Sequence, residues 1–178
     1  MKLLSNKELI FIPILVVSMI VIMLTYLAFK GRPKTPASIE KVEIVLSNHD
    51  LTYSNETDYY EAQWENNNTL KNALIANSGD IYFCYFVFDN KDDAEKLRAN
   101  NRSYIREHRF SIPNTEVSEA ISNYILYTLK CEVGYTVSMR VENTVVYAYC
   151  NEENTNVIKT IMQEMNTSHK TEHLGRTE

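Results

Sequence analysis

The longest uninterrupted run of hydrophobic positions lies near the start of the chain, from Leu9 to Phe29. The run contains no charged residue, and its polar interruptions are Ser18, Thr25 and Tyr26. A helix rises about 1.5 Å per residue, so a segment of this length spans about 30 Å, the thickness of the hydrocarbon core of a bilayer. The pattern therefore predicts a short tail over residues 1–8 and a transmembrane anchor over residues 9–29.

A cleaved signal peptide is the alternative interpretation of this run. Signal peptides have a shorter apolar core, and small side chains precede their cleavage site. Tyr26 puts a bulky side chain where a small one belongs, which favours an uncleaved anchor. Large domains translocate largely regardless of flanking charge. We therefore expect a single-pass protein of the cell membrane with a cytoplasmic N-terminus and an extracytoplasmic domain.

Helical periodicity recurs at three places after a short linker over residues 30–37. Ser38 can cap the first helix, although alternation of Val42, Ile44 and Leu46 also fits a strand. Asn90 can cap the second helix, whose inward stripe is Ala94, Leu97, Asn101, Tyr104, Ile105 and His108. The third helix begins at Asn154 or Thr155 and carries a stripe of Val157, Ile158, Ile161, Met162 and Met165.

Runs rich in β-branched and aromatic residues predict five strands between these helices. They cover residues 73–77, 81–89, 123–130, 135–141 and 144–150, whereas 51–68 is expected to be loop with some irregular strand. The resulting order is α-β-β-α-β-β-β-α. It predicts an α+β domain over residues 38–166 with a mostly antiparallel five-stranded sheet and about three helices, followed by a polar disordered tail over residues 167–178.

A turn at Glu142-Asn143 fixes the expected register of the last two strands. It places Val141 opposite Thr144, and the pairs that follow on the same face are Met139 with Val146 and Val137 with Ala148. This face is expected to be core. The opposite face is semi-polar, and we expect solvent to reach it; it carries Thr136, Ser138, Arg140, Val145, Tyr147 and Tyr149.

Charge and cysteine usage limit the function classes. The chain has 18 Lys and Arg against 23 Asp and Glu; five of these bases and one acid precede Ala37, which leaves 13 bases and 22 acids in the domain. An acidic domain is a poor nucleic-acid binder, because phosphate contacts supply most of that affinity. Cys84, Cys131 and Cys150 form no C-x-x-C pair and are expected to be small apolar residues in strands, with a single disulfide as the alternative.

Two groups of side chains are candidates for an interaction surface. The first is a row of arginines on one face of the second helix, which could bind phosphates or an acidic partner: Arg98, Arg102, Arg106 and Arg109. The second is an aromatic platform for a sugar or a peptide: Tyr127, Tyr147 and Tyr149. The alternatives are a solvated helix face for the arginines and ordinary strand packing for the tyrosines.

One segment matches the sequence motif of a class of metal-dependent peptidases. His169, Glu172 and His173 fit H-x-x-E-H, in which two histidines one helical turn apart hold zinc and the carboxylate activates water. The motif lies in the polar tail, which lacks any apolar stripe to hold a rigid helix. We therefore expect no metal, no cofactor and no enzymatic activity.

Three segments together resemble small membrane-tethered or lipoprotein-like α+β proteins of Gram-positive bacteria that carry an uncharacterised domain. The segments are Leu70-Lys71-Asn72-Ala73-Leu74-Ile75-Ala76, Phe88-Asp89-Asn90-Lys91-Asp92-Asp93-Ala94 and Val141-Glu142-Asn143-Thr144-Val145-Val146-Tyr147-Ala148. The resemblance spans about residues 38–166 and implies an extracytoplasmic, non-enzymatic domain. Proteins of this kind have no assigned activity, so it supplies no functional residue.

These observations lead to one functional hypothesis and two alternatives. The hypothesis is a membrane-anchored, non-enzymatic binding module whose partner is a protein, a cell-wall component or a lipid headgroup. The first alternative is an accessory subunit of a membrane protein complex. The second is a metal-dependent hydrolase that uses His169, Glu172 and His173.

Overall fold

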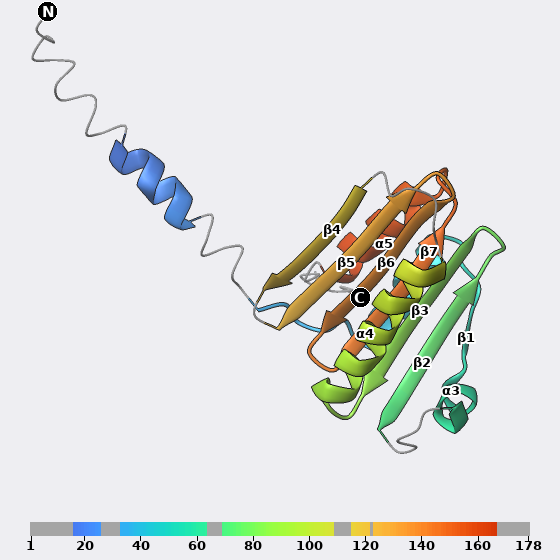
Figure 1. Ribbon diagram of the computed structural model, residues 1–178. Helices are drawn as coiled ribbons and strands as arrows, with labels where there is room; N and C mark the ends of the chain where they lie inside the picture. Colours follow the sequence, from blue (N-terminus) through green and yellow to red (C-terminus); the bar gives the residue numbers. More distant parts are fainter. Residues whose placement is uncertain (1–15, 26–32, 64–68, 109–114, 122, 167–178) are drawn as a thin grey trace, which may run out of the picture. The chain divides into compact units, whose positions relative to one another are not determined.

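The computed structural model describes residues 16–25, 33–63, 69–108, 115–121 and 123–166. The chain divides into two units, Met1–Pro33 and Lys34–Glu178. In the first unit the structure describes one helix, residues 16–25. All the strands belong to the second unit (Figure 1).

The described N-terminal helix corrects the prediction of a transmembrane anchor over residues 9–29. Within the described ranges, no helix is both long enough and apolar enough to cross a membrane. The predicted transmembrane segment, signal anchor and single-pass location in the cell membrane are therefore wrong.

The second unit is built on one antiparallel sheet of seven strands, not the five that the sequence predicted. The sheet order is β1-β2-β3-β7-β6-β5-β4. The strands are β1 (Tyr53–Asn55), β2 (Leu70–Asn77), β3 (Ile81–Phe88), β4 (Thr115–Ile121), β5 (Tyr124–Cys131), β6 (Gly134–Val141) and β7 (Thr144–Cys150). The helices of this unit are α2 (Ile39–Asn48), α3 (Thr57–Gln63), α4 (Lys91–His108) and α5 (Thr155–Asn166).

The elements that the sequence missed are β1, α3 and β4. Strands β1 and β4 are the two edges of the sheet, and neither contains a buried residue. Helix α3 has no buried residue either. A polar edge strand needs no continuous apolar face, so hydrophobic periodicity gives little sign of it. These three elements depend on pairing and packing with β2 and β5.

Two antiparallel meanders meet in the middle of the sheet. Strands β1, β2 and β3 form one meander, and β4, β5, β6 and β7 form the other. Helix α4 connects them, and β7 then pairs with β3, with Tyr82 opposite Tyr149 and Cys84 opposite Tyr147 (Figure 1). The centre of the sheet is therefore made by two strands that are distant in the sequence.

Helices cover both faces of the sheet. Helices α2 and α5 bury one face, where the core includes Leu46, Phe83, Val146 and Ile161. Helix α4 packs on the other face against β6, β7 and β3 (Figure 1). The core there combines Ala94 and Ile105 of α4 with strand residues of the alternate parity: Ala73, Cys84, Phe86, Phe88, Tyr127, Leu129, Val145 and Tyr147. The sheet is thus the middle of three layers.

The predicted register of the last two strands is confirmed. Val141 pairs with Thr144, and Met139 pairs with Val146. The prediction that solvent reaches the opposite face is wrong for most of that face, because α4 packs on it, whereas Arg140 and Tyr149 are half-buried. Ser138 on that face is completely buried, and its hydroxyl lies 3.4 Å from the carbonyl of Arg98 on the helix.

The helix starts follow the predicted capping residues. Ser38 caps α2 by accepting a hydrogen bond from the backbone N–H of Lys41, which decides between the helical and the strand interpretation of this segment. Asn90 Oδ1 accepts hydrogen bonds from the N–H groups of Asp92 and Asp93 at the start of α4. The three cysteines are free and buried in strands, as the sequence predicted.

Candidate functional site

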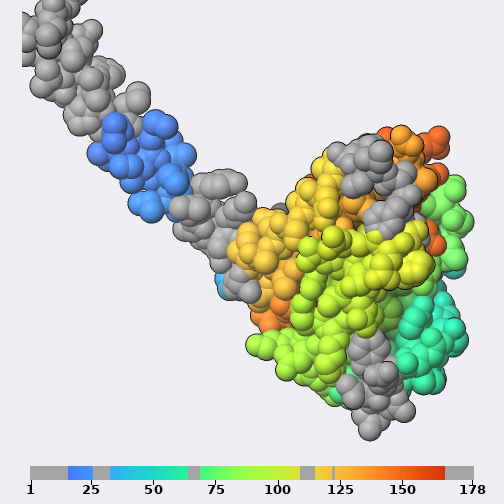
Figure 2. All heavy atoms as spheres, in the orientation of Figure 1, coloured from blue at the N-terminus to red at the C-terminus, as the bar shows by residue number. Residues whose placement is uncertain are grey.

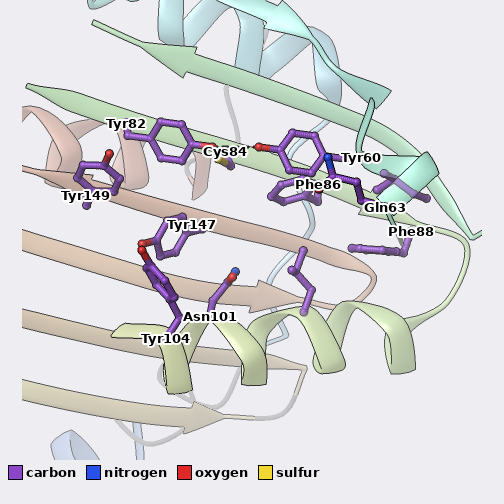
Figure 3. A pocket seen from close by; sticks show the side chains of 12 residues that line it. Tyr60, Gln63, Tyr82, Cys84, Phe86, Phe88, Asn101, Tyr104, Tyr147 and Tyr149 are labelled. Atoms are coloured by element: carbon purple, nitrogen blue, oxygen red, sulfur yellow. Dashed lines mark hydrogen bonds between the residues drawn. The ribbon is translucent and has the colours of Figure 1, made fainter. Parts of the chain in front are cut away.

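A cleft of about 690 Å³ opens on the face of the sheet that carries α4 (Figures 2 and 3). Helix α4 packs mainly over β6 and β7, whereas α3 packs on β2. Of the β3 side chains on this face, Cys84, Phe86 and Phe88 are buried at the base of the cleft and Tyr82 is half-buried. The lining residues are Tyr60, Gln63, Leu70, Tyr82, Cys84, Phe86, Phe88, Leu97, Asn101, Tyr104, Tyr147 and Tyr149.

Three tyrosines from β3 and β7 form one wall of the cleft. Tyr82 and Tyr149 lie opposite each other in the two strands, and their rings stack with centroids 5.1 Å apart. Tyr147 meets both rings edge-on, at 6.3 Å from Tyr82 and 6.2 Å from Tyr149. These contacts hold the three rings as one connected aromatic surface.

Helix α3 supplies the adjoining wall through Tyr60. The hydroxyl of Tyr60 lies 3.1 Å from the hydroxyl of Tyr82, so one hydrogen bond joins α3 to β3 (Figure 3). The ring of Tyr60 also meets Phe86 edge-on at 5.2 Å. Both contacts fix the direction of the Tyr60 ring.

Helix α4 supplies the facing wall with Leu97, Asn101 and Tyr104. Asn101 points from the helix into the cleft (Figure 3). Its Nδ2 is buried, and among the described residues it has no hydrogen-bond partner. A buried amide donor without a partner costs about 1–3 kcal/mol, so a partner that enters the cleft would recover that free energy.

Three ionisable groups of the cleft, those of Tyr60, Tyr82 and Cys84, stay protonated at neutral pH. Burial raises the pKa of Tyr82 and of Tyr60 above the ordinary value for a phenol. Burial also raises the pKa of the Cys84 thiol to about 12, although the nearby Tyr82 hydroxyl opposes this shift. Among the described lining residues there is no Asp, Glu, His, Lys or Arg. The cleft therefore offers neutral hydrogen-bonding groups and apolar surface.

The structure separates the three tyrosines of the predicted platform. Tyr147 and Tyr149 lie together in the cleft. Tyr127, on β5, is only 1% exposed and lies apart from the cleft. The guanidinium carbon of Arg102 is 5.1 Å from the centre of the Tyr127 ring, which is the distance of a cation–π contact.

The predicted arginine row is divided as well. Arg98 is only 8% exposed, and its Nη2 lies 2.5 Å from Glu95 Oε1. Arg140 on β6 reaches the other oxygen of Glu95 at 2.9 Å. Arg98 therefore neutralises a carboxylate that also ties α4 to the sheet.

The remaining arginines of the row have different surroundings. Arg106 is exposed near the end of α4. Arg102 lies between Arg98 and Arg106 and is partly covered by its contact with Tyr127. Arg109 lies outside the described residues. Within the described part of α4, the arginines do not form one solvated stripe.

Of the twelve lining residues, only Tyr147 and Tyr149 were predicted as site residues; Tyr60, Tyr82 and Asn101 are among those that were not. Tyr82 becomes a neighbour of Tyr149 only through the pairing of β3 with β7, which the sequence did not predict. Asn101 did carry a signal, because it is a polar residue within the inward stripe of the second predicted helix. A polar side chain in that position needs a partner, and this requirement could have marked it.

No metal centre is found in the described residues. Within these ranges, no group of three or more His, Cys, Asp or Glu side chains could hold an ion. The motif of His169, Glu172 and His173 lies outside the described residues, as does the predicted disordered tail.

Comparison with known proteins supplies no family. No protein-family model matches the chain, and no curated protein and no solved structure shows a significant similarity to it.

Proposed function

We propose that the domain is a non-enzymatic binding module and that the cleft between α3 and α4 holds its ligand. The observation that carries the proposal is the aromatic cleft of about 690 Å³. Small-molecule sites are typically concave, mostly apolar and about 300–1,000 Å³ in volume, with a few polar groups inside. The described lining combines apolar and aromatic surface with phenol and amide groups in this way.

The chemistry of the lining favours binding over catalysis. A general base has to be deprotonated near the operating pH. The phenols of Tyr60 and Tyr82 and the thiol of Cys84 have raised pKa values, so they can donate hydrogen bonds but are poor proton acceptors at neutral pH. The hydrolase alternative and the accessory-subunit alternative from the sequence stay untested predictions.

Titration of the full chain with pools of small molecules tests the proposal. The pools contain uncharged aromatic compounds, saccharides and short peptides, and binding is followed by 1H–15N correlation spectra. Leu97→Trp fills the cleft from α4, and Ile44→Trp is the matched control on the exposed side of α2, on the other face of the sheet. Thermal unfolding verifies that both variants fold.

We expect at least one compound to shift the resonances of cleft residues. Its affinity should fall at least about tenfold in Leu97→Trp, because a bulky ring then occupies the site, and should stay unchanged in Ile44→Trp. The proposal fails if no pool perturbs the cleft. It also fails if every bound compound has the same affinity for Leu97→Trp as for the unaltered chain.

A further inference from the structure

Resting on the proposed function, we propose that the ligand is an uncharged, planar aromatic molecule with a hydrogen-bond acceptor that meets Asn101 Nδ2. Three independent features of the cleft point to this class. They are the arrangement of the aromatic rings, the charge of the lining and the one buried amide donor that the described residues leave without a partner.

We infer a planar ligand from the two walls that face each other across the cleft. Leu97, Asn101 and Tyr104 on α4 face the side chains of β3 and α3 across the cleft (Figure 3). On the sheet side, the rings of Tyr82 and Tyr149 stack on each other and both line the cleft. A planar guest contacts both walls at once and can meet these rings in an offset-stacked or edge-on arrangement. A saccharide would require more polar partners than the amides of Asn101 and Gln63 provide beside the phenols.

We infer that the ligand is uncharged because a charged group would have to be desolvated in the cleft. A charged ligand group would lose its hydration in the cleft, which costs several kcal/mol unless an opposite charge compensates it. None of the described lining residues carries a formal charge at neutral pH. The guanidinium groups of Arg98 and Arg140 are not among these lining residues, and both bind Glu95.

We infer that the ligand carries a hydrogen-bond acceptor because the side chain of Asn101 offers a donor. The Nδ2 atom is buried, and the described residues give it no partner. A ligand carbonyl, ether or hydroxyl oxygen placed against Nδ2 satisfies the donor, whereas a hydrocarbon of the same shape leaves it unsatisfied. Sites that hydrogen-bond their ligand discriminate against analogues that lack the bonding atom for this reason.

Four probes of similar size test the three features separately. 2-Acetylnaphthalene is planar, uncharged and carries a carbonyl acceptor, and 2-isopropenylnaphthalene replaces that oxygen by a CH2 group. 2-Naphthoate adds a negative charge, and cellobiose is uncharged but not aromatic. Dissociation constants are measured by 1H–15N titration of the full chain, of Asn101→Leu and of Asn100→Leu, an exposed control on the same helix.

The expected order of affinity is the acetyl probe, then the isopropenyl probe, with the naphthoate and cellobiose weaker than both. One net hydrogen bond corresponds to about a threefold to tenfold preference for the acetyl probe. Asn101→Leu should abolish the preference for the acetyl probe over the isopropenyl probe, while the naphthoate and cellobiose should still bind more weakly than both. Asn100→Leu should preserve the preference. The side-chain amide signal of Asn101 should move with the acetyl probe only.

Equal affinity for the acetyl and isopropenyl probes in the unaltered chain overturns the inference. Tighter binding of naphthoate or cellobiose overturns it too, and so does the absence of binding by all four probes. In those cases the proposed function is still decided by the pools and by Leu97→Trp. If a pool compound binds the unaltered chain but not Leu97→Trp, the proposed binding function stands and only the proposed ligand class is wrong.

Discussion

The hydroxyl groups of Tyr60 and Tyr82 lie 3.1 Å apart, and this hydrogen bond joins α3 to the central strand β3 at the mouth of the cleft. Helix α3 has no buried residue of its own. The bond therefore helps to position this helix, together with the hydrogen bond that the Thr57 hydroxyl accepts from the backbone N–H of Ala73 on β2.

Replacing either hydroxyl should weaken this connection. We expect Tyr60→Phe and Tyr82→Phe each to lower the free energy of unfolding by about 1 kcal/mol, the net value of a typical hydrogen bond. The double variant should cost less than the sum of the two, because both remove the same bond. Urea unfolding measures all three, and Tyr104→Phe, at a position that is 48% exposed, is the control. Additive costs would show that the two hydroxyls act independently.

Glu95 should be essential for the packing of α4 on β6. It binds the buried Arg98 and also Arg140, whose side chain is only 12% exposed. Glu95→Gln leaves two nearly buried guanidinium groups without their counter-charge, which destabilises a protein strongly. The carboxylate is itself 39% exposed, so solvent reduces the effect, and we expect a loss of about 1–3 kcal/mol.

Glu107→Gln is the matched control for this prediction, because Glu107 is exposed on the same helix. Its effect should stay within about 0.5 kcal/mol, as for an ordinary surface substitution. Chemical denaturation of both variants provides the comparison. Equal effects of the two substitutions would contradict a structural role for Glu95.

The start of α4 should lose stability in acid. Hydrogen bonds from Lys96 and Asn90 lower the pKa of Asp93 from 3.8 to about 2. A lowered pKa in the folded state means that the unfolded chain binds more protons between these values. The contribution of Asp93 is therefore complete above about pH 4 and is lost as the pH falls towards about 2.

Asp93→Asn should accordingly flatten the dependence of stability on pH in this range. Thermal unfolding between pH 2 and pH 5 measures the slope. Asp92→Asn, an exposed neighbour on the same turn, should keep the slope of the unaltered chain. If Asp93→Asn retains that slope as well, Asp93 is not the group responsible.

Two glycines with positive φ should respond very differently to alanine. A Cβ at Gly134 would lie 1.9 Å from the carbonyl oxygen of Cys150, and φ is +140°. A Cβ at Gly79 meets nothing within 4 Å, although φ is +78°. We expect Gly134→Ala to cost about 3 kcal/mol or more, and Gly79→Ala about 1–2 kcal/mol. Similar unfolding midpoints for the two variants would refute the clash at Gly134.

The part of the fold that the sequence predicted is the part with a strong local pattern. The alternation of Val137, Met139 and Val141 gave the correct register with β7 because one face of those strands is buried. The exposed edge β4 carries no comparable signal, since Val117 is 43% exposed. The apolar run from Leu9 to Phe29 led to the prediction of a transmembrane helix, whereas no helix within the described ranges is long and apolar enough to cross a membrane.

The candidate site was only partly predictable because its members come from distant segments. Tyr147 and Tyr149 share a face by simple alternation, so the sequence placed them together. Tyr60 and Tyr82 join them only after β3 has paired with β7 and α3 has packed on β2. The same limitation applies to Arg98, which was predicted on a surface. It is instead paired with Glu95 on the same helix, and Glu95 also binds Arg140 on β6.

The pairing of β3 with β7 also has a consequence for biosynthesis. Ile81–Phe88 is apolar on both faces, yet its partner Thr144–Cys150 leaves the ribosome some 60 residues later, a separation of about 3–12 s at ordinary elongation rates. Until then the nascent chain exposes one edge of a strongly hydrophobic strand, the kind of edge that promotes aggregation. The chain is therefore most prone to aggregation between the emergence of β3 and that of β7, and a chaperone that binds β3 in this interval would protect it.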